Sequence, residues 1–378
     1  MELTNKNIII ISQQDWGEMF ISKHHYALEL SKMGNAVYFL NGPDQGRKLK
    51  PGEIKIEPTK YPGLYVISHR FFFPYIFRFK AKFLFKYLIA IHIKRIIKKI
   101  NKDINIAWSF DISGTIPLKA FPASTVKVFM PVDEPFYPQA LSVAESAEII
   151  VSVTTEILEK YEQYKAPKLF LNHGVADIFI NDTLEEKINN PLRVGLSGNF
   201  LRPDIDRRIL LQIIESNPEI IFECWGSVNY SNSNITAPKD NEALEFCNKL
   251  CNYPNVKAHG PVNAATLGKS LKEVDCFLIC YDIQKDQSKG TNYHKILEYL
   301  ATGKVIISNN VTTYQKYTGL LVMAQSRINN NELPDLFRNV IRDIKKYNAV
   351  GEQQKRVDFA REYLYSKQLK KIELALTV

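Results

Sequence analysis

Thr291-Asn-Tyr-His-Lys-Ile-Leu-Glu-Tyr-Leu-Ala-Thr-Gly-Lys304 runs directly into Val305-Ile-Ile-Ser308, and this stretch decides the fold. Apolar residues recur at helical spacing in its first part, which predicts a helix with one buried face: Ile296, Leu297, Leu300 and Ala301. Gly303 predicts the end of that helix, and the apolar run after it predicts a short buried strand. A helix that leads at once into a buried strand is typical of an α/β sheet.

The other face of this helix carries Lys295, Glu298 and Thr302. We expect Thr291 or Asn292 to cap the helix, which leaves free backbone N–H groups beside the lysine. Such a helix start suits an anion, and Glu298 could accept hydrogen bonds from the hydroxyls of a ribose. An i,i+3 ion pair between Lys295 and Glu298 on a solvated face is the alternative, and spacing alone leaves both open.

The segment from Lys295 to Ser308 resembles the nucleotide-sugar signature of GT-B glycosyltransferases, which reads Lys-hydrophobic-hydrophobic-Glu-Tyr-x-Ala-x-Gly-Lys-Pro-Val. The resemblance implies that Lys295 binds the donor diphosphate and that Glu298 binds the donor ribose. Val305 stands where proline is usual. Gly290 stands where retaining members often carry a second glutamate, so the sugar and the stereochemical outcome stay open.

The bulk composition indicates a globular chain of two domains, because 378 residues with 45% hydrophobic and 24% charged residues can bury two cores. Five cysteines, none before Cys224, do not suit a disulfide framework and indicate a reducing cytosol. Cys276 and Cys280 lie inside one apolar run, which argues against zinc. We expect no metal and no cofactor. The sequence predicts neither a signal peptide nor a membrane span.

The first half opens with a β-α-β pattern: a strand over 7–11, a helix over 22–33 and a strand over 36–40. The loop after the first strand carries Asp15, Trp16 and Gly17, and the helix carries His24. This opening is similar to that of bacterial surface-polysaccharide transferases of the family 4-like and teichuronic-acid types. The resemblance implies that Trp16, Gly17 and His24 lie beside the acceptor; turn and capping roles are the alternative.

Acidic residues follow two later strands of the first half. Asp111 follows the strand predicted over 104–109, and Asp133 follows the strand predicted over 126–132. A carboxylate at the carboxyl end of a strand is suited to act as a general base on an acceptor hydroxyl. Asp133 is the first choice, with Asp15 and Asp111 behind it; capping of the next segment is the alternative for each.

The second half opens with a strand that runs into the glycine turn Gly198-Asn199. In the family that this chain resembles, such a loop and a nearby Arg or Lys hold the donor phosphates, and Arg202 is preferred here over Arg207 and Arg208. The remaining residues that the resemblance assigns to the donor are His259, Tyr281 and Thr291.

The segment from Ile76 to Lys102 carries nine Lys and Arg residues and no acid, with aromatic residues interleaved. This pattern is typical of a helix that rests on an anionic membrane surface. A domain helix with a basic solvated face is the alternative. Nucleic-acid binding is a third interpretation, but no reading motif accompanies it, so we expect no nucleic-acid partner.

The sequence therefore predicts an α/β protein with two doubly wound, Rossmann-like domains that face a cleft (GT-B), with a C-terminal helix that crosses back. Residues 1–175, with a helix from about 352 to 378, form the predicted acceptor-binding domain, and residues 190–350 the predicted nucleotide-sugar domain. The implied function is a metal-independent glycosyltransferase, of the hexosyltransferase type, that moves a sugar from a nucleoside-diphosphate sugar such as a UDP-sugar to a glycan. The acceptor would be lipid-linked, at the cytoplasmic face of a bacterial membrane. A nucleotide-sugar epimerase or hydrolase and a non-catalytic scaffold are the alternatives.

Overall fold

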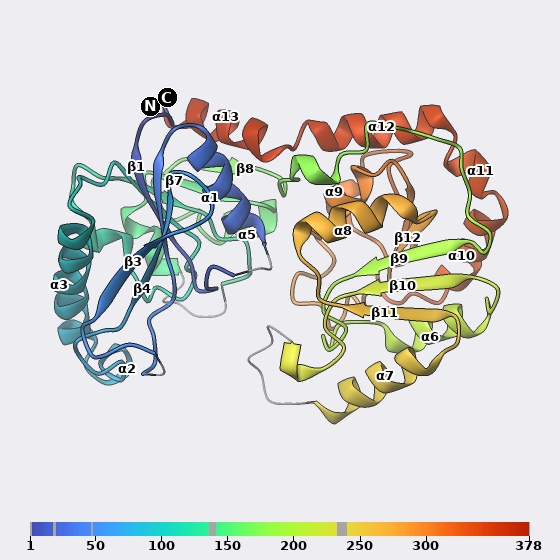
Figure 1. Cartoon of the computed structure of the whole chain (residues 1–378), viewed down its shortest axis with the longest axis horizontal. Helices are drawn as coiled ribbons and strands as arrows, with labels where there is room; N and C mark the ends of the chain where they lie inside the picture. The colour runs from blue at the N-terminus through green and yellow to red at the C-terminus, as the bar shows by residue number, and fades with distance from the viewer. Residues whose placement is uncertain (1, 18–19, 47, 136–140, 233–239, 378) are drawn as a thin grey trace. The chain divides into compact units, whose positions relative to one another are not determined.

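The computed structural model describes the chain except for residues 1, 18–19, 47, 136–140, 233–239 and 378. It divides into two compact units, each built around one sheet (Figure 1). Unit 1 comprises Met1–Asn172 and Tyr365–Val378, and unit 2 comprises His173–Leu364. Both sheets are almost entirely parallel, which agrees with the predicted pair of doubly wound domains.

The sheet of unit 1 has the strand order β3-β4-β2-β1-β5-β6-β7-β8, and only the β3–β4 pair is antiparallel. The order changes direction between β1 and β5, which pair in parallel. The strands are short, and β1, β2, β5 and β7 are apolar and buried, as in a sheet that helices cover, whereas the edge strand β3 is largely exposed. Their bounds are β1 (Asn7–Ile11), β2 (Ala36–Leu40), β3 (Ile54–Pro58), β4 (Leu64–His69), β5 (Ile106–Ser109), β6 (Val126–Phe129), β7 (Ile149–Ser152) and β8 (Lys168–Phe170).

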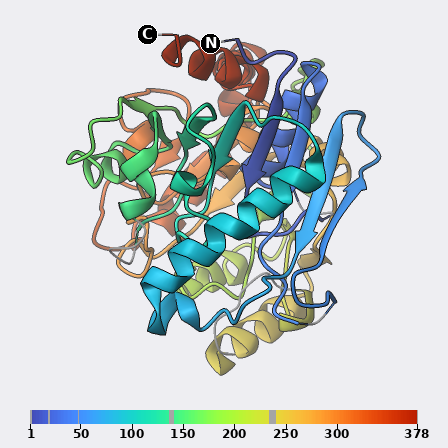
Figure 2. The same cartoon turned by 90° about the vertical axis from the view of Figure 1, so that its left-hand side faces the viewer.

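The helices of unit 1 are α1 (Ser22–Lys32), α2 (Phe77–Lys80), α3 (Lys82–Ile100), α5 (Thr155–Glu159) and α13 (Tyr365–Ala375), with 3-10 turns at Leu118–Ala120 and Val143–Ser146. The long helix α3 crosses the side of unit 1 that Figure 2 turns toward the viewer. α13 packs on α1, where the Tyr365 ring stacks on His25 with 4.9 Å between the ring centroids. Both ends of the chain therefore belong to unit 1. Of the helices in the described part of the chain, none has both the length and the apolar character that a membrane crossing requires.

The sheet of unit 2 has the order β11-β10-β9-β12-β13-β14 and is parallel throughout. Its strands are β9 (Arg193–Ser197), β10 (Ile221–Trp225), β11 (Val256–Gly260), β12 (Cys276–Ile279), β13 (Val305–Ser308) and β14 (Val322–Met323). β10 and β11 are added on one side of β9, and β12, β13 and β14 are added on the other. Ligands of doubly wound sheets bind at such a reversal, outside the carboxyl ends of the strands.

The helices of unit 2 are α6 (Arg207–Glu215), α7 (Asn241–Asn252), α8 (Ala264–Ser270), α9 (Lys295–Leu300), α10 (Leu333–Arg342), α11 (Ile344–Tyr347) and α12 (Val350–Arg361). Shorter 3-10 turns lie at Asp177–Phe179, Tyr230–Asn232, Leu271–Glu273 and Thr312–Tyr314.

The stretch that decides the fold forms α9 and β13, as predicted. The four apolar residues of α9 and its following turn are fully buried, and Gly303 ends the helix with a φ of +82°. The predicted cap is wrong, because α9 begins at Lys295 with His294 at the N-cap. Thr291 instead belongs to a loop, where its carbonyl oxygen accepts a hydrogen bond from the backbone N–H of Thr313 (3.1 Å). Lys295 and Thr302 are also buried, rather than on a solvated face.

The C-terminal segment is divided between the units. The sequence predicts one helix from about residue 352, whereas the structure breaks it after α12. The backbone N–H of Val175 donates a hydrogen bond to the carbonyl of Tyr363 (2.9 Å), and this pairing ends the helix. α12 remains in unit 2, where the Arg356 guanidinium donates to the carbonyl of Gly303 (2.9 Å), and only α13 joins unit 1.

Candidate functional site

The candidate site of unit 2 lies where the strand order of its sheet reverses. β9 and β12 are neighbours there, and a small pocket opens at their carboxyl ends, lined by Ser197, Gly198, Asn199, Tyr281 and Lys295 together with apolar residues. β9 ends at Ser197 and β12 begins at Cys276, and the parallel sheet brings their carboxyl ends to one edge. Five of the predicted site residues therefore lie close to this edge: Gly198, Asn199, Arg202, Tyr281 and Lys295.

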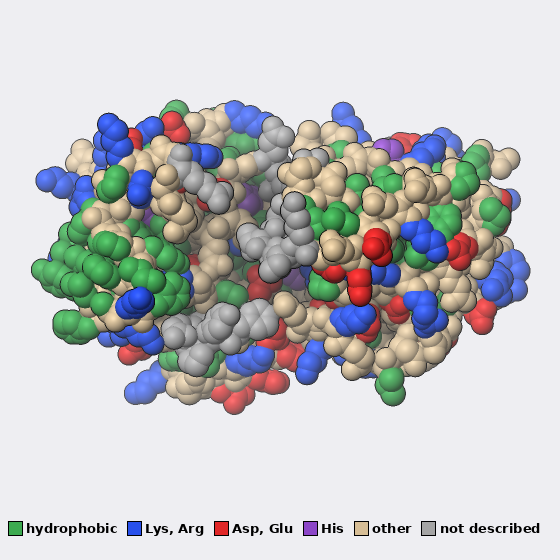
Figure 3. Space-filling model, turned by 90° about the horizontal axis from the view of Figure 1, so that it is seen from below, with side chains coloured by type: hydrophobic (Ala, Val, Ile, Leu, Met, Phe, Trp, Pro, Cys, Tyr) green, Lys and Arg blue, Asp and Glu red, His purple; other side chains and the backbone are tan. Residues whose placement is uncertain are grey.

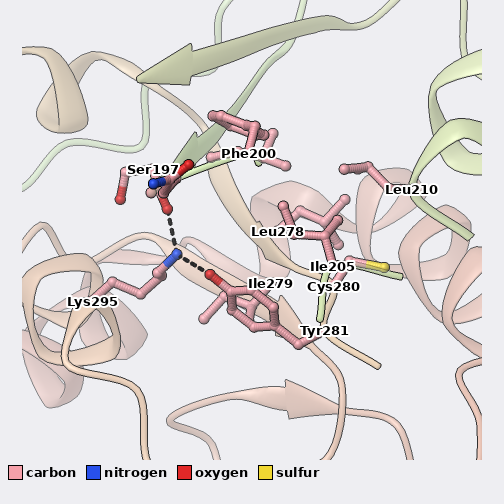
Figure 4. Close-up of a pocket in the computed structure, with 12 residues that line it drawn as sticks. Ser197, Phe200, Ile205, Leu210, Leu278, Ile279, Cys280, Tyr281 and Lys295 are labelled. Carbon is pink, nitrogen blue, oxygen red and sulfur yellow. Dashed lines mark hydrogen bonds between the residues drawn. The ribbon is translucent and has the colours of Figure 1, made fainter. Parts of the chain in front are cut away.

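Lys295 is the central group of this pocket. Its side chain is buried, with 8% of the residue exposed, and its ammonium donates hydrogen bonds to the Ser197 carbonyl and the Tyr281 hydroxyl, the latter over 2.7 Å (Figure 4). The ammonium also lies 5.0 Å from the centroid of the Tyr281 ring. An ammonium has three N–H donors, so one remains for an anionic ligand. Lys295 and Glu298 form no ion pair, so the alternative of an i,i+3 ion pair on a solvated face is wrong.

Gly198 is a glycine because the lysine lies against it. Its φ is +137°, a conformation that other residues rarely adopt, and a Cβ there would lie 2.7 Å from the Lys295 Nζ. Gly226, at the end of β10, supports the same turn, since a Cβ on it would lie 1.7 Å from the Gly198 carbonyl oxygen. The sequence interpretation did not assign Gly226 to the site. The signal was present, because the glycine directly follows a buried strand.

Arg202 lies beside this pocket and is fixed by two acids. Its guanidinium is paired with Asp204 through Nε (2.8 Å) and a terminal nitrogen, and it lies 3.9 Å from Asp286. The hydrogen bonds that Arg202 donates to the Asp204 carboxylate raise the pKa of Arg202, so the positive charge is permanent. The side chain remains 45% exposed and can contact a ligand. Arg207 and Arg208 are instead engaged with Asp240 and Asn331, which supports the preference for Arg202.

Glu298 lies one turn after Lys295 on α9 and is half-buried. Its carboxylate has no hydrogen bond or ion pair to any other described residue, so both oxygens are available to a ligand. Burial raises the pKa of Glu298 from its ordinary value to about 7, and the Lys295 ammonium partly opposes this shift. The carboxylate is therefore poised to gain or lose its charge near neutral pH.

Tyr299, which the sequence interpretation placed outside the site, holds the Ser197 end of β9. Its hydroxyl accepts a hydrogen bond from the backbone N–H of Ser197 (2.7 Å), and its ring stacks on Phe277 with 3.9 Å between centroids. Because Ser197 also binds Lys295, Tyr299 fixes the carbonyl that the ammonium contacts. No local pattern in the sequence reveals this role, since a tyrosine on an apolar helix face reads as core.

The other predicted donor residues lie in different surroundings. The Asn199 side chain accepts a hydrogen bond from the backbone of Leu201 (3.0 Å) and so shapes the glycine turn. Thr291 is buried in the loop before α9. His259 lies on β11, where its ring stacks on Trp225 (5.2 Å) and its Nε2 contacts the Glu223 carboxylate (2.5 Å). β11 is two strands away from β9, so His259 lies outside the pocket around Lys295, called the lysine pocket below.

The three acids predicted as bases belong to unit 1. The Asp111 carboxylate is buried and accepts hydrogen bonds from Gln13, Ser113 and the backbone of Ile116, which indicates that it holds the loop after β5. Asp133 follows β6, is exposed, and has no hydrogen bond or ion pair to another described residue. Asp15 is also exposed and lies in the loop after β1. Asp133 therefore differs from Asp111, whose carboxylate is buried and hydrogen-bonded.

A buried lysine that the sequence interpretation did not consider lies near these acids. Lys23, at the start of α1, is 3% exposed, and its ammonium donates to the Gln14 side-chain carbonyl. Burial lowers the pKa of Lys23, and the carboxylates of Asp133 and Asp111 oppose this shift. The end of the unit 1 sheet thus combines one cation with two acids at its carboxyl edge.

The residues predicted to lie beside the acceptor form an aromatic cluster in unit 1. The His24 ring stacks on Phe39 (4.9 Å), and both of its nitrogens are engaged, by the carbonyl of Asp15 and the backbone N–H of Ile21. Burial lowers the pKa of His24 to about 4, so the ring is neutral at physiological pH. Trp16 packs against His24 and Phe39, whereas Gly17 is exposed, with no atom within 4 Å of a Cβ built on it.

Within the described part of the chain, no group of three or more His, Cys, Asp or Glu side chains could hold a metal ion. Cys276 and Cys280 are buried, and burial raises the pKa of both thiols well above the ordinary value. They therefore behave as apolar core residues.

Comparison with known proteins supports the fold. No protein-family model and no curated protein matches the chain. Among solved structures, Anabaena HepE in complex with UDP and glucose has a TM-score of 0.68 at 12% identity, over 99% of this chain and 100% of that chain. Sucrose-phosphate synthase from Thermosynechococcus elongatus has a TM-score of 0.66 at 13% identity, over 99% and 98%. TarM has a TM-score of 0.54 at 11% identity, over 77% and 58%. These likenesses and the two parallel sheets show that the chain has the GT-B fold.

Proposed function

We propose that this protein is a glycosyltransferase that moves a sugar from a UDP-sugar to a hydroxyl group of a glycan acceptor. The observation that carries the proposal is the buried Lys295 ammonium at the strand-order reversal of unit 2, against a glycine turn that leaves room for a ligand. Solved structures of the same fold hold UDP or UDP-glucose, which supports UDP as the nucleotide. The Glu298 carboxylate, one turn along α9, is placed to accept hydrogen bonds from the ribose hydroxyls.

In the proposed reaction, the bond between the sugar C1 and the diphosphate oxygen breaks, and a bond between C1 and the acceptor oxygen forms. The electron pair leaves with UDP, whose growing negative charge Lys295 and Arg202 stabilise. These fixed cations would supply the charge stabilisation without a metal ion. If the anomeric configuration inverts, the acceptor proton passes to the Asp133 carboxylate.

The position of Gly290 bears on how the donor sugar is recognised. A Cβ there would lie 2.9 Å from the Asn310 carbonyl oxygen, and the residue has a φ of +65°. The loop therefore cannot accommodate a glutamate without rearrangement. We propose on this basis that sugar recognition uses residues other than the glutamate that retaining members often carry.

The test is UDP release from a panel of UDP-sugars, measured with and without glycan acceptors and repeated with EDTA. We expect release to require an acceptor and to survive EDTA. Asp133→Asn should lower kcat by about 100-fold or more, the usual contribution of a general base, with little effect on UDP affinity. Asp103→Asn, at an exposed acid of the same unit, is the matched control and should retain activity.

Each alternative has its own result. UDP release that is equally fast without any acceptor would indicate a hydrolase. A protein that binds UDP but releases none from any UDP-sugar, and whose UDP affinity is unchanged in Asp133→Asn, would be a sugar-nucleotide scaffold. This result would contradict the proposal.

We further propose that the acceptor is lipid-linked, as in surface polysaccharide synthesis, and that the protein rests on the cytoplasmic face of an anionic membrane. Figure 3 shows hydrophobic side chains gathered at the left of the view, the side on which α2 and α3 lie. The exposed residues of this patch are Ile76, Phe79, Phe83, Leu84 and Tyr87, and Phe83 is 89% exposed. Lysines at positions 80, 82 and 86 alternate with them and would contact lipid phosphates.

A further inference from the structure

Unit 2 contains a second pocket, at the opposite end of its sheet from the lysine pocket. It has a volume of about 250 Å³ and lies where β12 and β13 begin, beside the segment that follows the Asp177–Phe179 turn. This volume is slightly below the roughly 300 Å³ at which pockets for drug-sized ligands begin, so the pocket suits a smaller molecule. Its lining is mostly polar and includes Thr183, Glu185, Lys187, Lys272, Glu273 and Lys304.

Lys304 is the lysine of this pocket that is buried and whose ammonium has no partner among the described residues. Only 6% of the residue is exposed, and it lies on the pocket wall directly before β13. Its ammonium forms no hydrogen bond or ion pair with any residue that the structure describes. Burial lowers the pKa of Lys304, opposed first by Asp275 and then by Glu185. Because most of this side chain is buried, a ligand that pairs with its ammonium would bind favourably.

Asp275, the acid that most strongly opposes the lowered pKa of Lys304, does not form an ion pair with it. The Asp275 oxygens accept hydrogen bonds from the backbone N–H groups of Asn189 (2.9 Å) and Arg193 (2.7 Å), and from the Asn189 side chain (3.1 Å). Asp275 therefore holds the segment before β9 in place. Its carboxylate is occupied and does not pair with Lys304.

Two further lysines line the same pocket and come from different segments of the chain. The Lys272 ammonium, in the turn before β12, donates to the Ile180 carbonyl (2.6 Å) and keeps two further N–H donors. Lys187 is exposed. Three lysines oppose two glutamates in the lining, which leaves an excess of one positive charge. The hydroxyl of Thr183 and the two carboxylates could contact the hydroxyl groups of a ligand.

We propose that this pocket binds a small phosphate-bearing molecule, whose phosphate contacts Lys304 with support from Lys187 and Lys272. The site is separate from the lysine pocket, because it lies at the amino ends of the strands, whereas the lysine pocket lies at their carboxyl ends. A phosphate group carries several acceptor oxygens and up to two charges, which suit a pocket lined by three lysines. The proposal does not depend on the proposed transferase activity.

The test is the unfolding temperature of the full-length protein in potassium phosphate and in potassium chloride of equal ionic strength. All proteins carry Lys295→Ala, so that phosphate binding at the lysine pocket does not contribute. We expect phosphate to raise the unfolding temperature, because it binds the folded state. The increase should disappear in Lys304→Met and fall by at least half in Lys187→Gln. Lys269→Gln, at an exposed lysine of α8 outside the pocket, should retain the full increase.

Lys187→Gln keeps the test decisive if Lys304→Met does not fold, because Lys187 is exposed and its replacement leaves the core intact. The proposal is overturned if phosphate leaves the unfolding temperature of the Lys295→Ala protein unchanged. It is equally overturned if Lys187→Gln and Lys269→Gln show the same increase as their parent.

Discussion

Single residues of the lysine pocket depend on one another across long sequence separations. The resemblance to the nucleotide-sugar signature pointed to Lys295, and a glycine after a buried strand pointed to Gly198. The sequence did not reveal that the two touch, because their contact requires β9 and β12 to be neighbours. Spacing alone also left open whether Lys295 lies on a solvated face, and the structure shows that the residue is buried. Helical periodicity reports only which residues share a face, not what packs against that face.

Gly198→Ala should therefore weaken UDP binding. The added methyl group would lie 2.7 Å from the Lys295 Nζ, and alanine is strained at a φ of +137°. We expect a loss of UDP affinity of about tenfold or more, and a loss of stability of about 1–3 kcal/mol from backbone strain. Isothermal titration calorimetry and chemical denaturation measure the two effects. Gly17→Ala is the control, since no atom lies within 4 Å of a Cβ there, and unchanged binding in both variants would contradict this account.

Glu298 should make UDP binding dependent on pH. Its pKa in the free protein is raised to about 7, so the carboxyl group is mostly protonated below that pH and mostly ionised above it. An ionised carboxylate accepts stronger hydrogen bonds from ribose hydroxyls. We expect UDP affinity to fall as the pH is lowered from 8 to 6.

The comparison with Glu298→Gln isolates this effect, because UDP itself also changes its charge in the same range. The variant should bind UDP more weakly at pH 8 and should show a shallower dependence on pH. If calorimetry finds parallel curves for the two proteins, Glu298 does not contact the nucleotide through its charge.

At the scale of elements, the apolar strands and their flanking helices could be predicted from the sequence, but some ends could not. β1, β2 and β13 match their predicted ranges because uninterrupted apolar runs read clearly as buried strands. The start of α9 was missed because Thr291 is held in a loop by Thr313, a contact between segments. The break between α12 and α13 was missed for the same reason, since the pairing of Val175 with Tyr363 ends the helix.

The pair α2 and α3 should bind anionic vesicles through their exposed aromatic residues. Phe83→Ser should lower binding to vesicles that contain phosphatidylglycerol by about tenfold, because a largely exposed phenylalanine gains much of its burial energy in the bilayer interface. Phe170→Ser, at a 40% exposed phenylalanine of β8 in the same unit, is the matched control. Vesicle co-sedimentation measures both. Equal binding of the two variants, or binding to neutral vesicles at the same strength, would exclude this surface.

At the scale of the whole molecule, the sequence predicted two doubly wound domains and a C-terminal return, and the structure agrees on both. The return is carried by α13 alone, which completes the core of unit 1 beside α1. How the predicted base and donor residues act on one substrate did not follow from the sequence, because they belong to different units.

Loss of packing under α13 should destabilise unit 1 without affecting the donor site. Leu369 on α13 is fully buried, and Leu369→Ala should cost about 2–5 kcal/mol. Leu374 is 68% exposed on the same helix, so Leu374→Ala should cost little. UDP affinity should remain unchanged in both variants, since the donor residues all lie in unit 2. Denaturation and calorimetry test these expectations; a stable Leu369→Ala variant would contradict the assignment of α13 to the unit 1 core.

The central claim is that Lys295 holds the diphosphate of a UDP-sugar, and UDP titration by calorimetry tests it most directly. The wild-type protein and Lys316→Ala, at an exposed lysine of the same unit, should bind UDP equally well. Lys295→Ala should lower UDP affinity at least tenfold while losing little of the affinity for uridine, which lacks the diphosphate. Equal UDP affinity in Lys295→Ala and Lys316→Ala would contradict the claim.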